Sequence, residues 1–123
     1  MKHRLIIVDD SLIIRNRIGR LAARADLPDF SVVGVAADGE QALKLAAEQQ
    51  PTVMTMDLTM PNMDGEACIE QLVDRYPELR ILVVSALADK TTALRAIRKG
   101  AQGFLHKPFS DDDLVDSLRE LML

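Results

Sequence analysis

Short runs of apolar residues alternate along the chain with segments in which apolar residues recur at helical spacing. The runs are rich in β-branched residues, and we expect strands at residues 5–8, 32–36, 53–56, 81–84 and 103–105. Most of these runs are apolar throughout rather than alternating, so we expect strands that are buried on both faces. Strands that alternate with helices in this way predict an α/β fold of the (βα)5 type, in which helices cover both faces of a parallel sheet.

The five helical segments between these runs have apolar stripes and defined ends. We expect Ser11, Asp38 and Ser110 to begin the first, second and fifth helices, with Asp113 reaching back to Ser110. The first helix should end before Pro28, the second spans residues 39–49, the third stops at Pro77 and the fourth ends at Gly100. The stripes expected to face the sheet are Ile14, Ile18, Leu21, Ala22 and Ala25; Ala42, Leu43, Ala46 and Ala47; Ile69, Leu72, Val73 and Tyr76; Ala93, Leu94 and Ile97; and Leu114, Val115, Leu118, Leu121 and Met122.

Length and composition narrow the classes of protein. A chain of 123 residues predicts one domain over residues 1–123, and 48% apolar with 28% charged residues is typical of a soluble globular protein. The net charge of −4 argues against direct nucleic-acid binding. The apolar runs are far shorter than the ~20 residues that cross a membrane. Cys68 has no partner for a disulfide, which agrees with a cytoplasmic location.

Polar side chains follow the predicted strands at the points where they end. The residues concerned are Asp9, Asp10, Asp57, Ser85 and Lys107. Because right-handed crossovers bring the carboxyl ends of parallel strands to one edge of the sheet, we expect these side chains to share one pocket.

Three carboxylates in one pocket repel one another unless a cation that prefers hard oxygen ligands is bound. Mg2+ suits such a site, because it is usually held by few protein carboxylates together with water and a phosphate oxygen. A carboxylate can attack phosphorus to give an acyl phosphate, and such transfer is catalysed mainly by positioning and charge neutralisation. The neutralising groups would be Mg2+ and Lys107.

As a spaced set, these residues resemble the receiver domains of two-component response regulators, the family that includes the chemotaxis regulator CheY. The resemblance covers essentially the whole chain and rests on Asp9 and Asp10 after LIIV, Asp57 within DLTMPNMDG, Ser85 before Ala86, and Lys107 before Pro108. It implies a flavodoxin-like, CheY-like sheet with strand order 2-1-3-4-5. It also implies that a sensor histidine kinase or a phosphotransfer protein supplies the phosphoryl group, and that the output is a separate downstream protein or a fused domain.

The resemblance further implies a role for each matching residue. Asp57 would be the phosphoacceptor, Asp10 a direct Mg2+ ligand, Asp9 a ligand largely through water, and the backbone carbonyl of Thr59 a further ligand. Ser85 would donate a hydrogen bond to a phosphoryl oxygen, and Lys107 would form an ion pair with the phosphoryl group. The Lys107–Pro108 peptide would be cis.

Three positions depart from the chemotaxis regulator CheY, which has Thr, Tyr and Asn where this chain has Ser85, Phe104 and Thr59. Serine keeps the hydroxyl, whereas Phe104 lacks a phenolic OH, and Thr59 changes the surroundings of the acyl phosphate. We expect phosphorylation to draw Ser85 toward the phosphoryl group and to let the Phe104 ring turn inward. That movement would alter the surface formed by the fourth helix, the fifth strand and the fifth helix.

Charge on that surface suggests a further possibility. The fourth helix carries Lys90, Arg95, Arg98 and Lys99, and the fifth carries Asp111, Asp112, Asp113, Asp116 and Glu120. A symmetric homodimer through these elements is one interpretation, and an ordinary solvated helix face with an acidic first turn is the other.

Two other classes of protein share some of these residues or this fold. An aspartyl-phosphate phosphatase also has an Asp nucleophile, Mg2+ and a lysine, but such enzymes carry a second Asp two residues on, where this chain has Thr59. A binding module that uses the fold without phosphorylation would be expected to lack Asp57 or Lys107. We therefore expect a signalling switch that catalyses only its own phosphoryl transfer and dephosphorylation.

Overall fold

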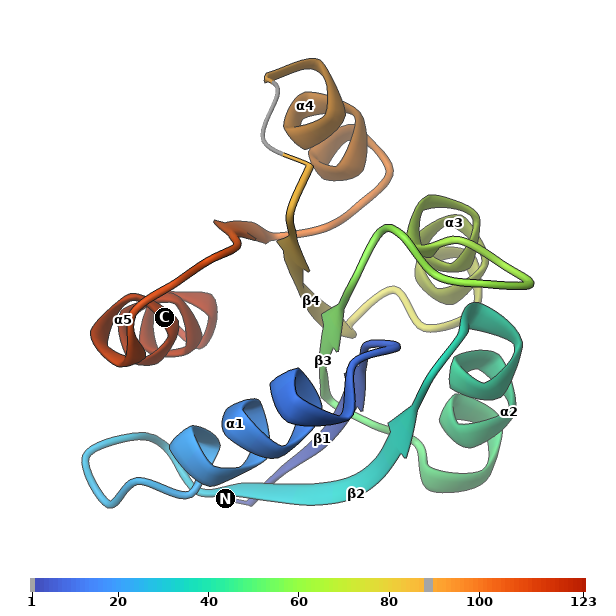
Figure 1. Cartoon of the computed structure of the whole chain (residues 1–123). Helices are drawn as coiled ribbons and strands as arrows, with labels where there is room; N and C mark the ends of the chain where they lie inside the picture. Colours follow the sequence, from blue (N-terminus) through green and yellow to red (C-terminus); the bar gives the residue numbers. More distant parts are fainter. Residues whose placement is uncertain (1, 88–89) are drawn as a thin grey trace.

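A parallel five-stranded sheet forms the centre of the molecule, as seen in a computed structural model that describes residues 2–87 and 90–123 (Figure 1). The strands are β1 (His3–Val8), β2 (Phe30–Ala36), β3 (Val53–Met56), β4 (Arg80–Ser85) and β5 (Gly103–His106). They are ordered β2-β1-β3-β4-β5, and every neighbouring pair is parallel. The predicted fold class and strand order are confirmed.

Helices cover both faces of this sheet (Figure 1). They are α1 (Leu12–Ala22), α2 (Gly39–Gln49), α3 (Gly65–Arg75), α4 (Lys90–Arg98) and α5 (Asp111–Leu121). Two clusters of buried apolar residues result, one between the sheet and α1 and α5, the other between the sheet and α2, α3 and α4. Ile7 and Leu118 belong to the first cluster, and Met54 and Leu72 to the second. A strand such as β3, buried at all four positions, contributes side chains to both.

The pairing register brings the carboxyl ends of the central strands level with one another. Val8, the last residue of β1, lies opposite Met56, the last residue of β3, and also opposite Ala36 of β2. Ser85, the last residue of β4, lies opposite His106 of β5. The residues that follow β1, β3 and β5 therefore begin along one edge of the sheet.

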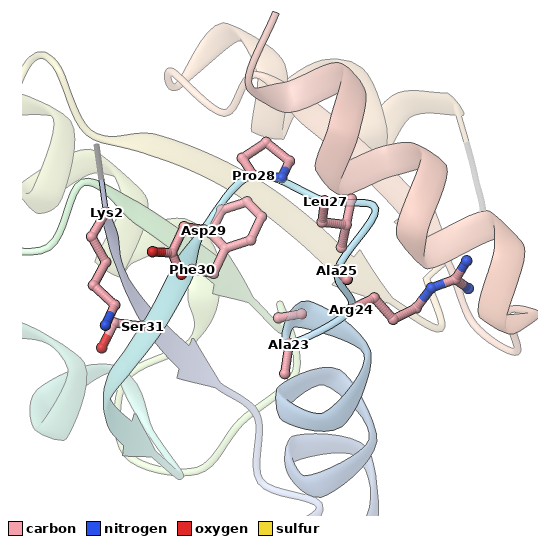
Figure 2. A pocket seen from close by; sticks show the side chains of 10 residues that line it. Lys2, Ala23, Arg24, Ala25, Leu27, Pro28, Asp29, Phe30 and Ser31 are labelled. Carbon is pink, nitrogen blue, oxygen red and sulfur yellow. The ribbon is translucent and has the colours of Figure 1, made fainter.

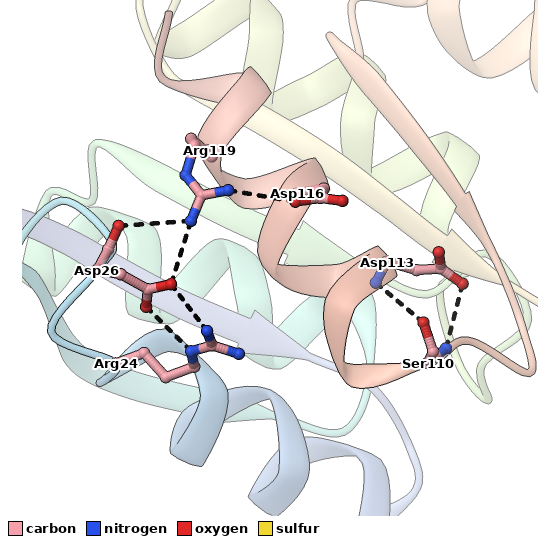
Figure 3. A network of polar contacts seen from close by, with 6 residues as sticks. All are labelled: Arg24, Asp26, Ser110, Asp113, Asp116 and Arg119. Carbon is pink, nitrogen blue, oxygen red and sulfur yellow. Dashed lines mark hydrogen bonds and ion pairs between the residues drawn. The ribbon is translucent and has the colours of Figure 1, made fainter.

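The predicted helix starts are confirmed by the caps. The side chain of Ser11 accepts a hydrogen bond from the Ile14 amide, and that of Asp38 accepts one from the Gln41 amide. Ser110 and Asp113 form the reciprocal capping box that begins α5 (Figure 3). Gly100 has a φ of 121°, a conformation that favours glycine, just after α4.

Some of the predicted inward stripes are wrong. The first helix ends at Ala22, before Pro28 as predicted, but Ala25 is exposed in the loop that follows, where Leu27 is buried instead. Ala47 of α2 is also exposed. In both places alanine is small enough to occupy either side of a helix or a loop at little cost, so its position says little about burial.

The fourth helix presents a different face to the sheet from the one predicted. Its buried residues are Thr92 and Ala96, whereas Leu94 and Ile97 are exposed and Ala93 is half-buried. A short helix with small residues on one side and large apolar residues on the other packs closely through the small side.

The second strand departs from the prediction, because it is not buried on both faces. Val32 and Val35 of β2 are exposed by 43% and 50%, because β2 is an edge strand that pairs with β1 alone. Each strand begins and ends within two residues of its predicted bounds. Within the described part of the chain, none of the helices has the length and apolar character needed to span a bilayer.

Candidate functional site

Three aspartates gather at the carboxyl edge of the sheet. Asp9 and Asp10 follow β1, and Asp57 follows β3. The Asp57 amide donates to the Val8 carbonyl at 3.0 Å, and the Asp9 amide donates to the Ala36 carbonyl at 3.0 Å, so the strand ladders continue into the site and fix its backbone. One carboxylate oxygen from each aspartate lies within 4.8 Å of the other two. The predicted convergence of the three acids is thus present in the structure.

The three carboxylates differ in their exposure and in their partners. Asp9 is completely buried and Asp57 is 4% exposed, whereas Asp10 is exposed. Asp9 Oδ1 accepts a hydrogen bond from the Ser11 amide at 2.9 Å, and Asp9 Oδ2 accepts one from Lys107 Nζ at 2.8 Å. Asp9 is therefore held on both oxygens by the protein, while Asp10 lies at the solvent side of the cluster.

Lys107, the residue that follows β5, brings a positive charge into the same cluster. Its Nζ lies 2.8 Å from Asp9 Oδ2 and 3.7 Å from Asp57 Oδ2, and its side chain is only 18% exposed. When all four groups are ionised, three negative charges face one positive charge, which leaves an excess of two. A divalent cation would balance that excess, and the clustered carboxylate oxygens are the donors that Mg2+ prefers. The residues present fit such an ion.

The charge of Asp57 responds to this environment. The pKa of Asp57 is raised from 3.8 to about 6: burial is the largest cause, the negative charges of Asp9 and Asp10 also act upward, and Lys107 and the Thr59 amide act in the lowering direction. The Thr59 amide donates to Asp57 Oδ1 at 3.3 Å. An acid whose pKa is shifted upward within a cluster of charged groups that includes a lysine is a candidate for chemistry.

The other predicted residues lie at the same edge of the sheet but make different contacts. Ser85 ends β4 and is fully buried, and its hydroxyl oxygen accepts a hydrogen bond from the Leu87 amide at 3.1 Å. Its carbonyl accepts the Lys107 amide at 2.8 Å, which ties the lysine to β4. Phe104 lies within β5, half-buried, against the cluster that α2, α3 and α4 cover. The predicted cis Lys107–Pro108 peptide is present.

Two residues that shape the site were not predicted to do so. Gly65, the first residue of α3, lies where a Cβ atom would come within 2.2 Å of the Asp57 carbonyl oxygen, so a side chain there would displace the Asp57 backbone. Arg15 on α1 donates from Nη1 to the Asp9 carbonyl at 2.8 Å. The place of Arg15 in the first turn of the helix after Ser11 could have indicated this contact, because the first turn lies close to the end of β1.

Two of the larger surface hollows lie away from the acids. One, of about 420 Å3, lies between the end of α1 and the start of β2, beside Arg24, Pro28 and Phe30 (Figure 2). Another, of about 470 Å3, is lined by residues before β3 and after α3. Both lie toward the amino ends of strands, whereas ligands of parallel α/β sheets bind beyond the carboxyl ends. The acid cluster is thus the site that the fold favours.

Comparison with known proteins agrees with this geometry. The family model described as the response regulator receiver domain matches residues 5–119. The chemotaxis protein CheY of Listeria monocytogenes is 34% identical over 117 residues, which are 95% of this chain and 96% of that protein. The transcriptional regulatory protein DegU of Brevibacillus brevis is 32% identical over 96% of this chain, which spans 49% of DegU.

A solved structure supports the same assignment. The crystal structure of the CheX–CheY–BeF3–Mg2+ complex from Borrelia burgdorferi contains a chain that is 25% identical and superposes with a TM-score of 0.92, over 98% of this chain and 90% of that one. Phosphorylation on an aspartate is the general function of the matched family, and its members bind Mg2+ through acidic residues. The acid cluster, the sheet topology and the family match together show that the chain belongs to the CheY-like receiver domains of two-component response regulators, which are signalling switches.

Proposed function

We propose that Asp57 is the phosphoacceptor of this receiver domain. The observation that carries the proposal is the position of its carboxylate: almost buried, 3.7 Å from Lys107 Nζ and in one cluster with Asp9 and Asp10. Asp9 is fully buried and both of its oxygens already accept hydrogen bonds, and Asp10 is exposed. Asp57 combines limited access with a free second oxygen close to a cation, which suits a nucleophile.

The transfer step conserves atoms and charge. An Asp57 carboxylate oxygen attacks the phosphorus of a phosphohistidine, the new O–P bond forms as the P–N bond breaks, and the electron pair remains on the imidazole nitrogen, which then binds a proton. Lys107 neutralises charge on the phosphoryl oxygens, because its ammonium group already faces the Asp57 carboxylate. The donor is a sensor histidine kinase or a phosphotransfer protein, and a small donor such as acetyl phosphate would replace it in a test.

The residues that would hold Mg2+ are Asp10, Asp57 and the backbone carbonyl of Thr59, with Asp9 acting largely through water. The ion, when bound, neutralises the charge that builds up on the phosphoryl oxygens. The exposed position of Asp10 suits a direct ligand, and the protein contacts of Asp9 suit an indirect one. The Thr59 amide fixes one Asp57 oxygen, which leaves the other for the reaction.

Hydrolysis would return the domain to its starting state. Water attacks the phosphorus of the acyl phosphate, the O–P bond to Asp57 breaks, and inorganic phosphate leaves while the carboxylate re-forms. Thr59 is exposed two residues beyond Asp57, at the rim where the water must arrive. A general phosphatase activity has less support, because Thr59 cannot act as an acid or a base.

Ser85 and Phe104 would transmit the change to the α4-β5-α5 surface. In the structure the Ser85 hydroxyl oxygen accepts a hydrogen bond from Leu87 and its own proton is available to donate, so a phosphoryl oxygen on Asp57 offers it a strong acceptor. Movement of Ser85 would move the segment after β4 and change the space beside Phe104. The recipient is a downstream protein or a fused output domain.

A homodimer through α4, β5 and α5 stays a prediction, as does the cytoplasmic location. Two of the cations considered for such a dimer have partners on α3, since Arg95 pairs with Glu66 and Lys99 with Glu70. These pairs favour the interpretation of α4 as a solvated helix face, and sedimentation with and without beryllofluoride would decide between the two.

The proposal is tested by incubating the protein with acetyl phosphate and Mg2+ and following phosphorylation by intact-mass spectrometry. We expect the wild-type chain to gain one phosphoryl group and Asp57→Asn to gain none. Asp74→Asn, which changes an exposed aspartate on α3, is the matched control and should be phosphorylated like the wild type. Equal phosphorylation of the Asp57→Asn variant would refute the proposal.

A further inference from the structure

The segment that carries Lys107 is short and is held at both ends. It consists of the residues between the end of β5 at His106 and the start of α5 at Asp111. On the β5 side, the Lys107 amide donates to the Ser85 carbonyl at 2.8 Å, so the backbone is fixed to the end of β4. On the α5 side, the Ser110–Asp113 capping box fixes the start of the helix (Figure 3). Lys107, Pro108 and Phe109 lie between these two fixed points.

Arg17 of α1 makes a further contact with this segment. Its Nη2 donates to the Phe109 carbonyl at 2.8 Å and to Asp111 Oδ1 at 2.8 Å, and its Nε donates to the same Asp111 oxygen at 3.1 Å. The guanidinium also lies over the Phe109 ring, with Cζ 4.4 Å from the ring centroid. One side chain thus binds the backbone, the ring and the helix start of the segment.

The neighbouring packing makes this arrangement specific for arginine. Phe109 is 5% exposed and belongs to the apolar cluster between the sheet and α1 and α5, so its ring presents one face to Arg17 from a fixed position. A planar guanidinium can stack on that ring and donate in its own plane at the same time, whereas a lysine ammonium can do only one of these. The Arg17 side chain is 27% exposed, so water screens its interactions only in part.

The geometry at Lys107 has little tolerance. Its Nζ lies 2.8 Å from Asp9 and 3.7 Å from Asp57, and a displacement of about 1 Å would lengthen the first contact beyond hydrogen-bond range. Among the described residues, Arg17 makes no hydrogen bond or ion pair with Asp9, Asp10 or Asp57; its contacts with the segment begin two residues after Lys107, at Phe109. An effect of Arg17 on the reaction would therefore have to pass through the position of Lys107.

We propose that Arg17 is a positioning residue for phosphoryl transfer, which holds the segment after β5 so that Lys107 lies between Asp9 and Asp57. This inference rests on the proposed function, because it assigns Lys107 a part in the reaction at Asp57. It predicts a reaction defect in a variant that leaves all three acids and Lys107 intact.

The test compares Arg17→Gln and Arg17→Lys with Arg119→Gln. Arg119 of α5 pairs with Asp26 in the loop after α1, so it also connects α5 to the region of α1, but it lies away from the Lys107 segment (Figure 3). With acetyl phosphate and Mg2+, we expect Arg17→Gln to slow phosphorylation on the order of tenfold, since misplacement of a charged group by about 1 Å has effects of this size or larger. Arg17→Lys should recover only part of the rate, and Arg119→Gln should keep the wild-type rate.

A double-mutant cycle separates positioning from general weakening of the fold. If Arg17 acts through Lys107, adding Arg17→Gln to Lys107→Gln should change the rate by less than about twofold. A tenfold loss in both backgrounds, or a wild-type rate in Arg17→Gln alone, would overturn the inference. A wild-type rate in Lys107→Gln would instead contradict the proposed part of Lys107 in the reaction.

A second readout does not depend on phosphorylation. The Lys107 side-chain methylene signals, followed by NMR in the full chain, should be dispersed in the wild type and in Arg119→Gln, and should move toward their unfolded-chain values in Arg17→Gln. Unchanged Lys107 signals in Arg17→Gln would overturn the inference even if the rate fell.

Discussion

Two groups of charged residues in this molecule have similar chemistry and opposite surroundings. At the carboxyl edge of the sheet, Asp9, Asp10, Asp57 and Lys107 form the acid cluster, in which Asp9 and Asp57 are buried and Asp10 is exposed. On the surface, Asp26 joins Arg24 at 2.7 Å and Arg119 at 3.3 Å, and Arg119 also binds Asp116 (Figure 3). The first group has three acids and one cation, and the second has two of each.

The difference appears in the direction of the pKa shifts. The hydrogen bond from Arg24 holds the pKa of Asp26 below its usual value, so the surface pairs favour the charged form that they already contain. Burial is the main reason that the pKa of Asp57 is raised to about 6, so the acid cluster disfavours the negative charge of Asp57. A balanced surface group needs no further ligand, whereas the acid cluster lacks positive charge. A divalent cation would supply that charge, and the cluster could then accept the added negative charge of a transient phosphoryl group.

The largest effect that separates the two groups should be in Mg2+ affinity. Asp10→Asn removes a proposed Mg2+ ligand and its charge from the acid cluster, and we expect the Mg2+ dissociation constant to rise by about 100-fold, at the upper end of the losses seen for residues around metals. Asp26→Asn removes the same charge from the surface group and should leave the affinity unchanged. Calorimetric titration of both variants with Mg2+ measures this contrast. Equal losses of Mg2+ affinity in the two variants would contradict the distinction between the acid cluster and the surface group.

The next effect concerns stability and pH in the absence of divalent cations. The folded-state pKa of Asp57 lies above its unfolded value of 3.8, so the folded protein binds more protons between about pH 4 and pH 6. The free energy of unfolding contributed by this group should therefore fall by roughly 2 to 3 kcal/mol as pH rises through that window.

Urea denaturation across the same pH range measures this slope. Asp57→Asn should lack the decline, and saturating Mg2+ should reverse it in the wild type, because the ion binds the ionised form. If the free energy of unfolding of the wild type matched that of Asp57→Asn at every pH, ionisation of Asp57 would not destabilise the folded protein.

The smallest effect should come from the surface group itself. Arg119→Gln breaks its exposed pairs with Asp26 and Asp116, which salt and water already screen. We expect thermal unfolding to shift by no more than about 3 °C, and the shift should shrink further at high salt. A larger change that persists in high salt would mean that this group contributes to the fold as strongly as a buried one.

Much of the fold and the reactive acids could be predicted because each depends on local sequence. Strand residues such as Leu5–Val8 of β1 are apolar throughout, and Asp9, Asp10 and Asp57 follow strand ends that parallel crossovers must bring together. The capping residues Ser110 and Asp113 are equally local. In each case the physical cause lies within a few residues of the feature that it produces.

The remaining features depend on partners distant in the chain. The inward face of α4 was predicted wrongly, since close packing selected the small side with Ala96 over the large side with Leu94. The contact of Arg17 with Phe109 joins residues 92 positions apart, and nothing in the helix around Arg17 indicates it. The need for glycine at residue 65 arises from the Asp57 carbonyl, which only the folded backbone places there.

The central claim, that the acid cluster prepares Asp57 to receive a phosphoryl group, is tested most directly by locating the modified residue. After reaction with acetyl phosphate and Mg2+, borohydride reduction converts an aspartyl phosphate to homoserine, which tandem mass spectrometry can place in the sequence. The account predicts homoserine at position 57 and its absence when Mg2+ is removed by a chelator. Homoserine at position 9 or 10 instead, or the same yield at 57 without Mg2+, would contradict it.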